Sequence, residues 1–254
     1  NVPKIISPTI TWETVSTLNI GLDAEFLKNR LGLAFDWYNR RTDDMMTRGE
    51  DLPYLLGTIA PNVNNASLTT KGFELALSWN QRISSDFAYN ARITLGDSRT
   101  TVLKFNNEKG VIDNYYVGKE VGEIWGYVTD GLIQTQGEAM YNQTFFYSTW
   151  GPGDMKYKNL DGDRYLDTNG NPIINDGTRT LDDHGDLTVI GNTSPRYNYS
   201  FTGGVNWKSF DFNMFWQGVG KHDYYPHTNA GMFYGMLTAF GSSTILKDSP
   251  ALDY

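Results

Sequence analysis

Six stretches in which apolar and polar residues alternate constrain this chain more than any other feature of its sequence. In the first, Leu18, Ile20 and Leu22 are apolar, and polar or small residues stand between them. The same alternation covers residues 31–37, 73–79, 87–95, 197–207 and 210–217, and helical periodicity is nearly absent. Each stretch is roughly ten residues long, which suits a tilted membrane-spanning strand and exceeds an ordinary strand. We therefore expect six long β-strands.

The connections between these expected strands have two very different lengths. Short polar turns at 27–30, 80–86 and 208–209 define three hairpins, at about 15–42, 66–101 and 195–218. Three much longer loops follow them, at 43–65, 102–194 and 219–254. Short turns at one end and long loops at the other are the layout of an outer-membrane β-barrel, whereas a soluble sandwich would mix loop lengths at both ends. The predicted fold class is all-β, a segment of a large antiparallel transmembrane β-barrel with long extracellular loops.

Aromatic residues make up 14% of the chain and gather near both ends of the expected strands. On the apolar phase, Phe26, Trp79 and Trp207 flank the short turns, and Trp37 and Trp216 lie nearer the long loops. Two such belts match the aromatic girdles at the two membrane–water interfaces. Aromatic residues also favour ordinary strands and sandwich cores, so a soluble β-sandwich remains the alternative.

Six strands are too few for a closed membrane barrel, because the smallest such barrels have about eight. An open sheet would leave unpaired backbone groups in lipid, where no water can satisfy them. We therefore expect that the chain is part of a barrel completed by other segments. A start at Asn1, without a basic and apolar leader, agrees with that expectation.

Five segments, in order along the chain, resemble the SusC/RagA-like TonB-dependent outer-membrane transporters of the Bacteroidetes. The first two are TWETVSTLNIGLDAEFLKNRLGLAFDWYNRRTDDM at 11–45 and LTTKGFELALSWN at 68–80. The third is VGKEVGEIWGYVTDGLIQT at 117–135, and the fourth joins GPGDMKYKNLDGDRYLD at 151–167 to IGNTSPRYNYSF at 190–201. The fifth is FDFNMFWQGVGKHDYY at 210–225. No single segment is strong evidence for the resemblance, but five segments in the same order as in the family make it specific.

The resemblance implies a barrel of roughly 22 strands around an N-terminal plug. It also implies energy from the TonB complex and a SusD-like surface lipoprotein that covers the extracellular mouth. The chain would be a C-terminal part of the barrel in the outer membrane, in contact with its lipid. The plug, the TonB-contacting segment and the closing strand would lie outside these 254 residues.

The function that the resemblance implies is TonB-dependent import of an oligosaccharide or a peptide. Two alternatives stay open at this point. One is a soluble β-sandwich that binds carbohydrate, which would be folded and soluble without detergent. The other is a passive porin-type channel, which would have the same barrel without a plug or energy coupling.

The loop at 102–194 combines aromatic rings with Asn, Asp and Gln side chains. Such a surface suits sugars or peptides, because ring faces stack on apolar surface while amides and carboxylates bind polar groups. The candidate substrate-binding residues are Tyr115, Tyr116, Tyr141, Phe145, Tyr147 and Trp150. The same side chains would equally serve to pack the loop against itself or against a partner.

An Asp-rich segment in this loop resembles a calcium-binding loop. The candidate ligands, at positions 1, 3, 5 and 9 of an EF-hand-type loop, are Asn159, Asp161, Asp163 and Asp167. Arg164 replaces the turn glycine, and Gly170 replaces the bidentate glutamate. Turn hydrogen bonds are the plainer interpretation. Four further acids, either additional ligands or solvated side chains, are Asp176, Asp182, Asp183 and Asp186. We expect no required cofactor.

Several classes of function are excluded by what the sequence contains. A net charge of −8 disfavours nucleic acid and anionic lipid head groups as main partners. The chain has no cysteine, no nucleotide-binding glycine motif and no hydrolase GxSxG motif. The strand carboxylates Asp23, Glu25 and Glu74 fall on the face expected to line a hydrated lumen, where they need no acid–base role. We therefore expect that the chain is not an enzyme.

Overall fold

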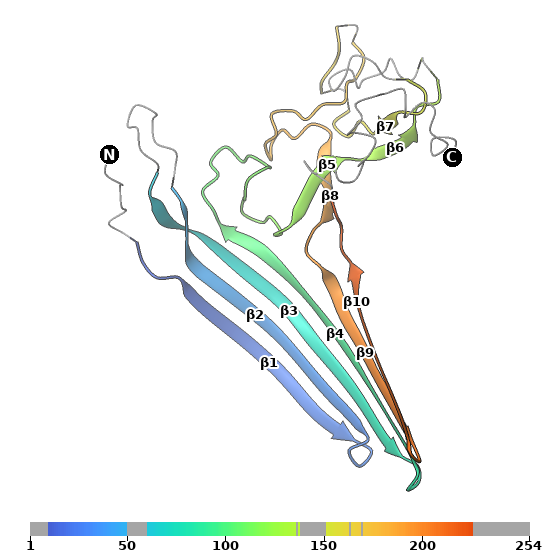
Figure 1. Cartoon of the computed structure of the whole chain (residues 1–254). Coiled ribbons are helices and arrows are strands. Elements are labelled where there is room, and N and C mark those ends of the chain that lie inside the picture. The colour runs from blue at the N-terminus through green and yellow to red at the C-terminus, as the bar shows by residue number, and fades with distance from the viewer. Residues whose placement is uncertain are drawn as a thin grey trace, which may run out of the picture. The chain divides into compact units, whose positions relative to one another are not determined.

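The computed structural model describes residues 10–49, 60–135, 137, 151–162, 164–168 and 170–225. The elements whose bounds it gives there are all β-strands. Six of them form one antiparallel sheet in the order β1-β2-β3-β4-β9-β10 (Figure 1). Their bounds are Thr14–Phe26 for β1, Leu31–Arg48 for β2, Asn62–Arg82 for β3, Phe87–Lys104 for β4, Arg196–Trp207 for β9 and Phe210–Lys221 for β10. The prediction of an all-β, antiparallel fold is confirmed.

Strands β2, β3 and β4 are longer than the alternation indicates, with 18, 21 and 18 residues. The expected first hairpin ends at residue 42, but β2 continues to Arg48, and β3 already begins at Asn62. These extensions pair with each other across register shifts between Thr42 and Met45 and between Met45 and Met46. They are mostly polar, so apolar alternation does not reveal them.

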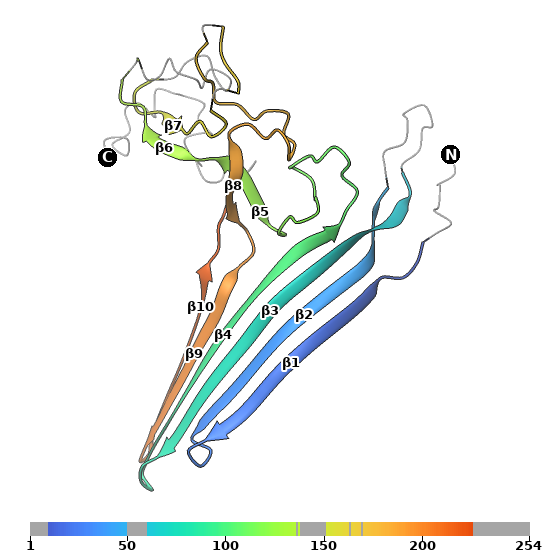
Figure 2. The ribbon, with the colours of Figure 1, turned by 180° about the vertical axis from the view of Figure 1, so that it is seen from behind.

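The three short turns lie at the same end of the sheet, and the long connections leave from the other end (Figures 1 and 2). In the β1–β2 turn, Leu27, Lys28 and Asn29 all have positive φ angles, between 57° and 64°. The Arg30 amide closes this turn by donating to the Phe26 carbonyl at 3.1 Å. The β9–β10 turn has only two residues, and Lys208 in it has a φ of 55°. This is the asymmetry that the loop lengths indicate.

The strand register gives the sheet one apolar and one polar face. One cross-strand row joins Leu22, Phe35, Leu75, Leu95 and Tyr199, which share the apolar face. On the other face, Asp36 lies opposite Glu74. The apolar face is exposed in this chain: the exposed fraction is 56% for Leu22 and 68% for Trp216. An exposed apolar face that crosses a whole sheet is typical of a surface that contacts lipid or another protein.

Residues 105–192, called the lobe below, carry four short strands in their described part. Strand β5 (Glu123–Tyr127) pairs with β8 (Leu187–Asn192), and β6 (Thr129–Leu132) pairs with β7 (Met155–Tyr157). Fully buried Ile112 and Ile174 belong to the lobe. The lobe is therefore a small folded unit with its own core, where the sequence suggests only a long loop. Its strands of three to six residues are too short to show alternation.

The sheet and the described part of the lobe belong to one compact unit, residues 1–222. None of the residues that the structure describes forms a helix long and apolar enough to cross a membrane.

Candidate functional site

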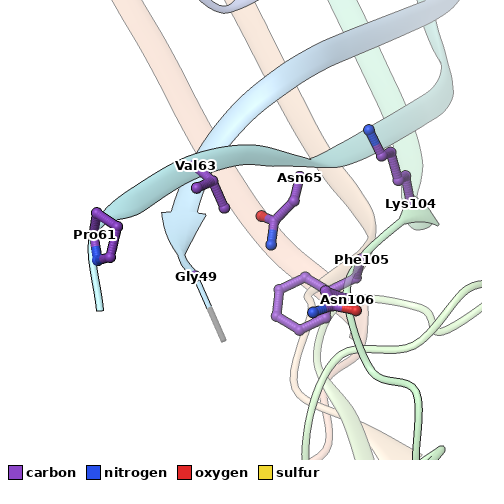
Figure 3. Close-up of a pocket in the computed structure, with 7 residues that line it drawn as sticks. All are labelled: Gly49, Pro61, Val63, Asn65, Lys104, Phe105 and Asn106. Atoms are coloured by element: carbon purple, nitrogen blue, oxygen red, sulfur yellow. The ribbon is translucent and has the colours of Figure 1, made fainter. Parts of the chain in front are cut away.

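A cavity of about 550 Å³ opens at the long-loop end of the sheet, where β2 and β4 end and β3 begins (Figure 3). Val63 and Asn65 on β3 face Phe105 and Asn106, which follow β4 (Figure 3). The remaining lining residues are Gly49, Pro61 and Lys104. The Gly49 amide donates to the Pro61 carbonyl at 2.9 Å and holds the ends of β2 and β3 together. A ring face, two amides and an ammonium group suit a sugar or a peptide.

Tyr115, one of the predicted substrate-binding residues, lies beside this cavity. Its ring meets the ring of Phe105 edge to face, with a centroid distance of 5.5 Å and an interplanar angle of 62°. The Asn107 amide group donates to the Tyr115 carbonyl at 2.9 Å and to the Val111 carbonyl at 2.9 Å. The turn at Asn107 thus positions Tyr115, and Tyr115 in turn orients Phe105. Phe105 itself lines the cavity but is not among the residues predicted from the sequence, because it stands outside the aromatic clusters of the lobe.

Tyr116, the second predicted residue, is engaged within the lobe. Its hydroxyl donates to the Glu123 carboxylate at 2.6 Å, and the Lys119 ammonium lies 5.1 Å from its ring centroid. Burial, followed by the hydrogen bond to Glu123, raises the pKa of Tyr116 to about 12. Lys119 is almost wholly buried and donates to the carbonyls of Ile112 and Asn114 at 2.7 and 2.9 Å. Burial lowers the pKa of Lys119.

Four of the predicted substrate-binding residues lie outside the described residues. They are Tyr141, Phe145, Tyr147 and Trp150. Their role in binding stays a prediction.

The Asp-rich segment forms turns stabilised by its own side chains. The Gly162 amide donates to Asn159 Oδ1 at 2.6 Å, and Asn171 donates to both carboxylate oxygens of Asp167, at 2.8 and 3.0 Å. Asp161 accepts from Asn175 Nδ2 at 3.0 Å, while its buried Oδ1 makes no hydrogen bond. The remaining predicted ligand, Asp163, lies outside the described residues. Within the described ranges, no three His, Cys, Asp or Glu residues are grouped to hold a metal ion.

Asp186 connects two parts of the Asp-rich segment, residues 160–161 and Asn175. It is fully buried and accepts hydrogen bonds from the amides of Leu160, Asp161 and Asn175, at 3.2 Å for Asp161 and 2.9 Å for Asn175. Asp183 is also buried, and accepts from the Tyr165 hydroxyl at 2.6 Å and the Thr178 amide at 3.0 Å. Both side chains are therefore buried rather than solvated. They are hydrogen-bond acceptors that hold the lobe together.

The lobe is attached to the end of β4 by backbone hydrogen bonds. The Val102 amide donates to the Lys119 carbonyl, the Gly118 amide to the Val102 carbonyl and the Val121 amide to the Thr100 carbonyl, each at 2.9 Å. The Ser194 hydroxyl donates to the Val121 carbonyl at 2.8 Å. Residues 118–121 of the lobe and Ser194, just after its end, therefore meet beside the last residues of β4.

A second hollow, of about 540 Å³, lies on the polar face of the sheet. Its lining includes Asp36 and Tyr38 of β2, Glu74 of β3 and Arg92 of β4. The carboxylates that the sequence places on a lumen-facing side, Glu74 among them, are thus on the face opposite the apolar one. In a barrel, this face would line the hydrated interior.

The chain matches no model of a protein family. Curated relatives are TonB-dependent receptors. The chain is 24% identical to TonB-dependent receptor P26 of Formosa agariphila over 226 residues, which cover 86% of this chain and 21% of that protein. It is 25% identical to TonB-dependent receptor SusC of Bacteroides thetaiotaomicron over 213 residues, which cover 84% of this chain and 20% of SusC. The chain therefore spans about a fifth of the length of the curated relatives it matches.

Solved structures of the RagAB peptide transporter have a similar fold. One aligns with a TM-score of 0.58 and 21% identity, over 83% of this chain and 21% of that chain. The closed-closed state of the RagAB peptide importer aligns with a TM-score of 0.59, over 84% of this chain and 22% of that chain. The described residues form a segment of such a barrel and do not close one. The relatives are receptors and transporters, which confirms the prediction that the chain is not an enzyme.

Proposed function

We propose, from the kinship of this chain with the SusC/RagA-like TonB-dependent receptors, that it forms part of the wall and mouth of an outer-membrane importer. TonB-dependent receptors of this family are β-barrel proteins of the outer membrane of Gram-negative Bacteroidetes, which is the location of this chain. The observation that supports the proposal most is the exposed apolar face of a sheet with short turns at one end and a folded lobe at the other.

The cargo that we propose is an oligosaccharide or a peptide, bound at the long-loop end of the sheet. The cavity beside Phe105 supports this, because it combines an aromatic ring with the amides of Asn65 and Asn106. Lys104 would bind a carboxylate on an acidic sugar or at the end of a peptide. A SusD-like lipoprotein would cover the mouth, and the TonB complex would act through a segment that is not among these residues.

Uptake by the full-length protein tests this proposal. A host strain without the gene should lose growth on one oligosaccharide or peptide mixture as sole carbon source, and the intact gene should restore it. A gene with a disrupted TonB-contacting segment should not restore growth. Equal growth with the disrupted gene would identify a passive channel, and a protein that stays soluble without detergent would identify a soluble sandwich.

A cavity variant tests the binding site itself. Phe105→Ala should raise the cargo concentration for half-maximal uptake by about tenfold, since 1.4 kcal/mol of lost ring contact corresponds to that factor. Phe210→Ala, at the short-turn end of the sheet, is the matched control and should leave that concentration unchanged. If both variants behave like the intact protein, the cavity is not the binding site.

Calcium in the Asp-rich segment remains a second proposal. It is supported by the spacing of the candidate ligands and by the buried Asp161 Oδ1 that makes no hydrogen bond. Calcium should protect the lobe of the full-length protein from protease, and Asp161→Asn should abolish this protection. Asp130→Asn, which removes the same charge from an exposed position in the lobe, is the control. If calcium does not change the rate at which protease cleaves the lobe of the intact protein, the proposed calcium site is wrong.

A further inference from the structure

On the apolar face of the sheet, the side chains change from aromatic to cationic within two residues. Trp37 of β2 lies opposite Phe73 of β3, which in turn lies opposite Asp97 of β4. Two residues closer to the long loops on each strand, the next row on this face joins Asn39, Lys71 and Arg99. Strands β2, β3 and β4 lie side by side (Figures 1 and 2), so both rows cross the same part of the sheet.

A groove of about 450 Å³ follows this boundary, and we call it the rim groove. The residues that define its chemistry are Trp37, Phe73, Lys71, Arg99, Thr101 and Arg196. The two rings supply apolar surface toward the middle of the sheet. The cations and the hydroxyl lie toward the long loops. A ligand with an apolar part and an anionic part would match this division.

The charges of the rim groove are not all available to a ligand. Arg196 is held by both carboxylate oxygens of Asp97, and both side chains are nearly buried. Arg99 pairs with Glu120 at 3.0 Å, but its side chain is 56% exposed, so this ion pair is weak and readily exchanged. Lys71 is exposed and makes no ion pair with any described residue.

Lys71 and Arg99 are direct cross-strand neighbours on the same face. Like charges in that position repel each other and destabilise a sheet. An anion between them removes the repulsion and gains two charge-assisted hydrogen bonds. The position of Lys71 directly opposite Arg99 within the groove therefore points to an anionic ligand.

We propose that the rim groove binds the phosphorylated head group of a lipid in the outer leaflet of the outer membrane. Lys71 and Arg99 hold the phosphate, and an acyl chain lies against Trp37 and Phe73. The inference rests on the proposed membrane location, in which the aromatic rows mark the interface and the long loops face outward. At that level, cations beside an apolar surface meet lipid head groups.

Lipid binding to the full-length protein, purified in detergent, tests this inference by native mass spectrometry. The probe is monophosphorylated lipid A, compared with the same lipid after dephosphorylation and with inorganic phosphate. We expect the phosphorylated lipid to bind, and the double variant Lys71→Gln, Arg99→Gln to bind it at least about tenfold more weakly. Arg92→Gln, on the polar face of the same sheet, should bind like the intact protein, and Lys71→Arg should retain binding.

Three results would overturn the inference. One is equal lipid binding by the double variant. Another is equal binding of the dephosphorylated lipid. The third is full competition by millimolar inorganic phosphate, which would indicate a site for free anions. Each variant is first checked for the heat-dependent gel mobility of a folded barrel. A folded, membrane-inserted protein without lipid specificity refutes this inference alone, whereas a protein that never enters the membrane refutes the proposed function.

Discussion

At the scale of single residues, Asp186 decides how the lobe is organised. Its carboxylate accepts amide hydrogen bonds from Leu160, Asp161 and Asn175, which come from two separate limbs of the chain. A buried acceptor of this kind holds these limbs together by hydrogen bonds, beside the small apolar core around Ile112 and Ile174. The sequence marks it only as one of several acids, because nothing local distinguishes a buried aspartate from a solvated one.

We expect Asp186→Asn to loosen the lobe by about 2 kcal/mol, because the new amide group would face N–H donors that then lack an acceptor. The measurement is the rate of limited proteolysis within the lobe of the full-length protein. Asp182→Asn, at an exposed neighbouring position, makes the same change in charge and should leave the rate unchanged. Equal rates for both variants would show that Asp186 does not organise the lobe.

Asp183 gives the lobe a dependence on pH. The hydrogen bond from the Tyr165 hydroxyl, together with those from Thr178, lowers the pKa of Asp183 below its ordinary value. A lowered pKa in the folded state adds stability above the unfolded pKa, and this stability is lost as pH falls through the folded pKa. Amide protection of residues 176–187 should therefore decrease below about pH 4. In Asp183→Asn, protection should be lower at neutral pH and should change less on acidification.

At the scale of elements, the strands show what alternation can and cannot reveal. The central parts of β1 and β2 were predictable, because Leu18 to Leu22 and Leu33 to Trp37 keep one face apolar along the strand. The outer end of β2, around Met45, was not, because Asp43 and Asp44 interrupt the alternation and the register shifts at Met45. The cavity was only partly predictable: Tyr115 follows from composition, whereas Phe105 reaches the cavity only through tertiary contacts.

Two neighbouring positions on β3 test which face contacts lipid. Leu77 lies on the apolar face, and Ala76, next to it, lies on the polar face. Leu77→Lys should destabilise the membrane-inserted protein by about 2–4 kcal/mol, because it places a charge in lipid between the levels of Phe73 and Trp79. Ala76→Lys should have a much smaller effect. Urea unfolding of the full-length protein in lipid vesicles measures both, and an inverted order would assign the lipid to the other face.

At the scale of the whole molecule, the six-stranded sheet ends in two edge strands, β1 and β10. Each edge presents backbone groups that pair with no strand of the described part of the sheet. In lipid these groups require partner strands from the rest of a barrel.

The 254-residue chain produced by itself should therefore require detergent and form mixed oligomers through its edges. The full-length protein in the same detergent should remain a single species in size-exclusion chromatography with light scattering. A monodisperse isolated chain in plain buffer would contradict the membrane assignment.

The contact between Val121 and Ser194 beside β4 also has a consequence for how such proteins diversify. The Val121 carbonyl accepts a hydrogen bond from the Ser194 hydroxyl, and the Val121 amide donates to the Thr100 carbonyl, so the chain on both sides of residues 122–193 is fixed beside β4. We therefore expect insertions, deletions or exchange of residues 122–193 to leave the register of β4 and β9 unchanged. Natural variation or protein engineering can thus replace this part of the lobe, and so change what the protein binds, without changing the strands of the sheet that carry it.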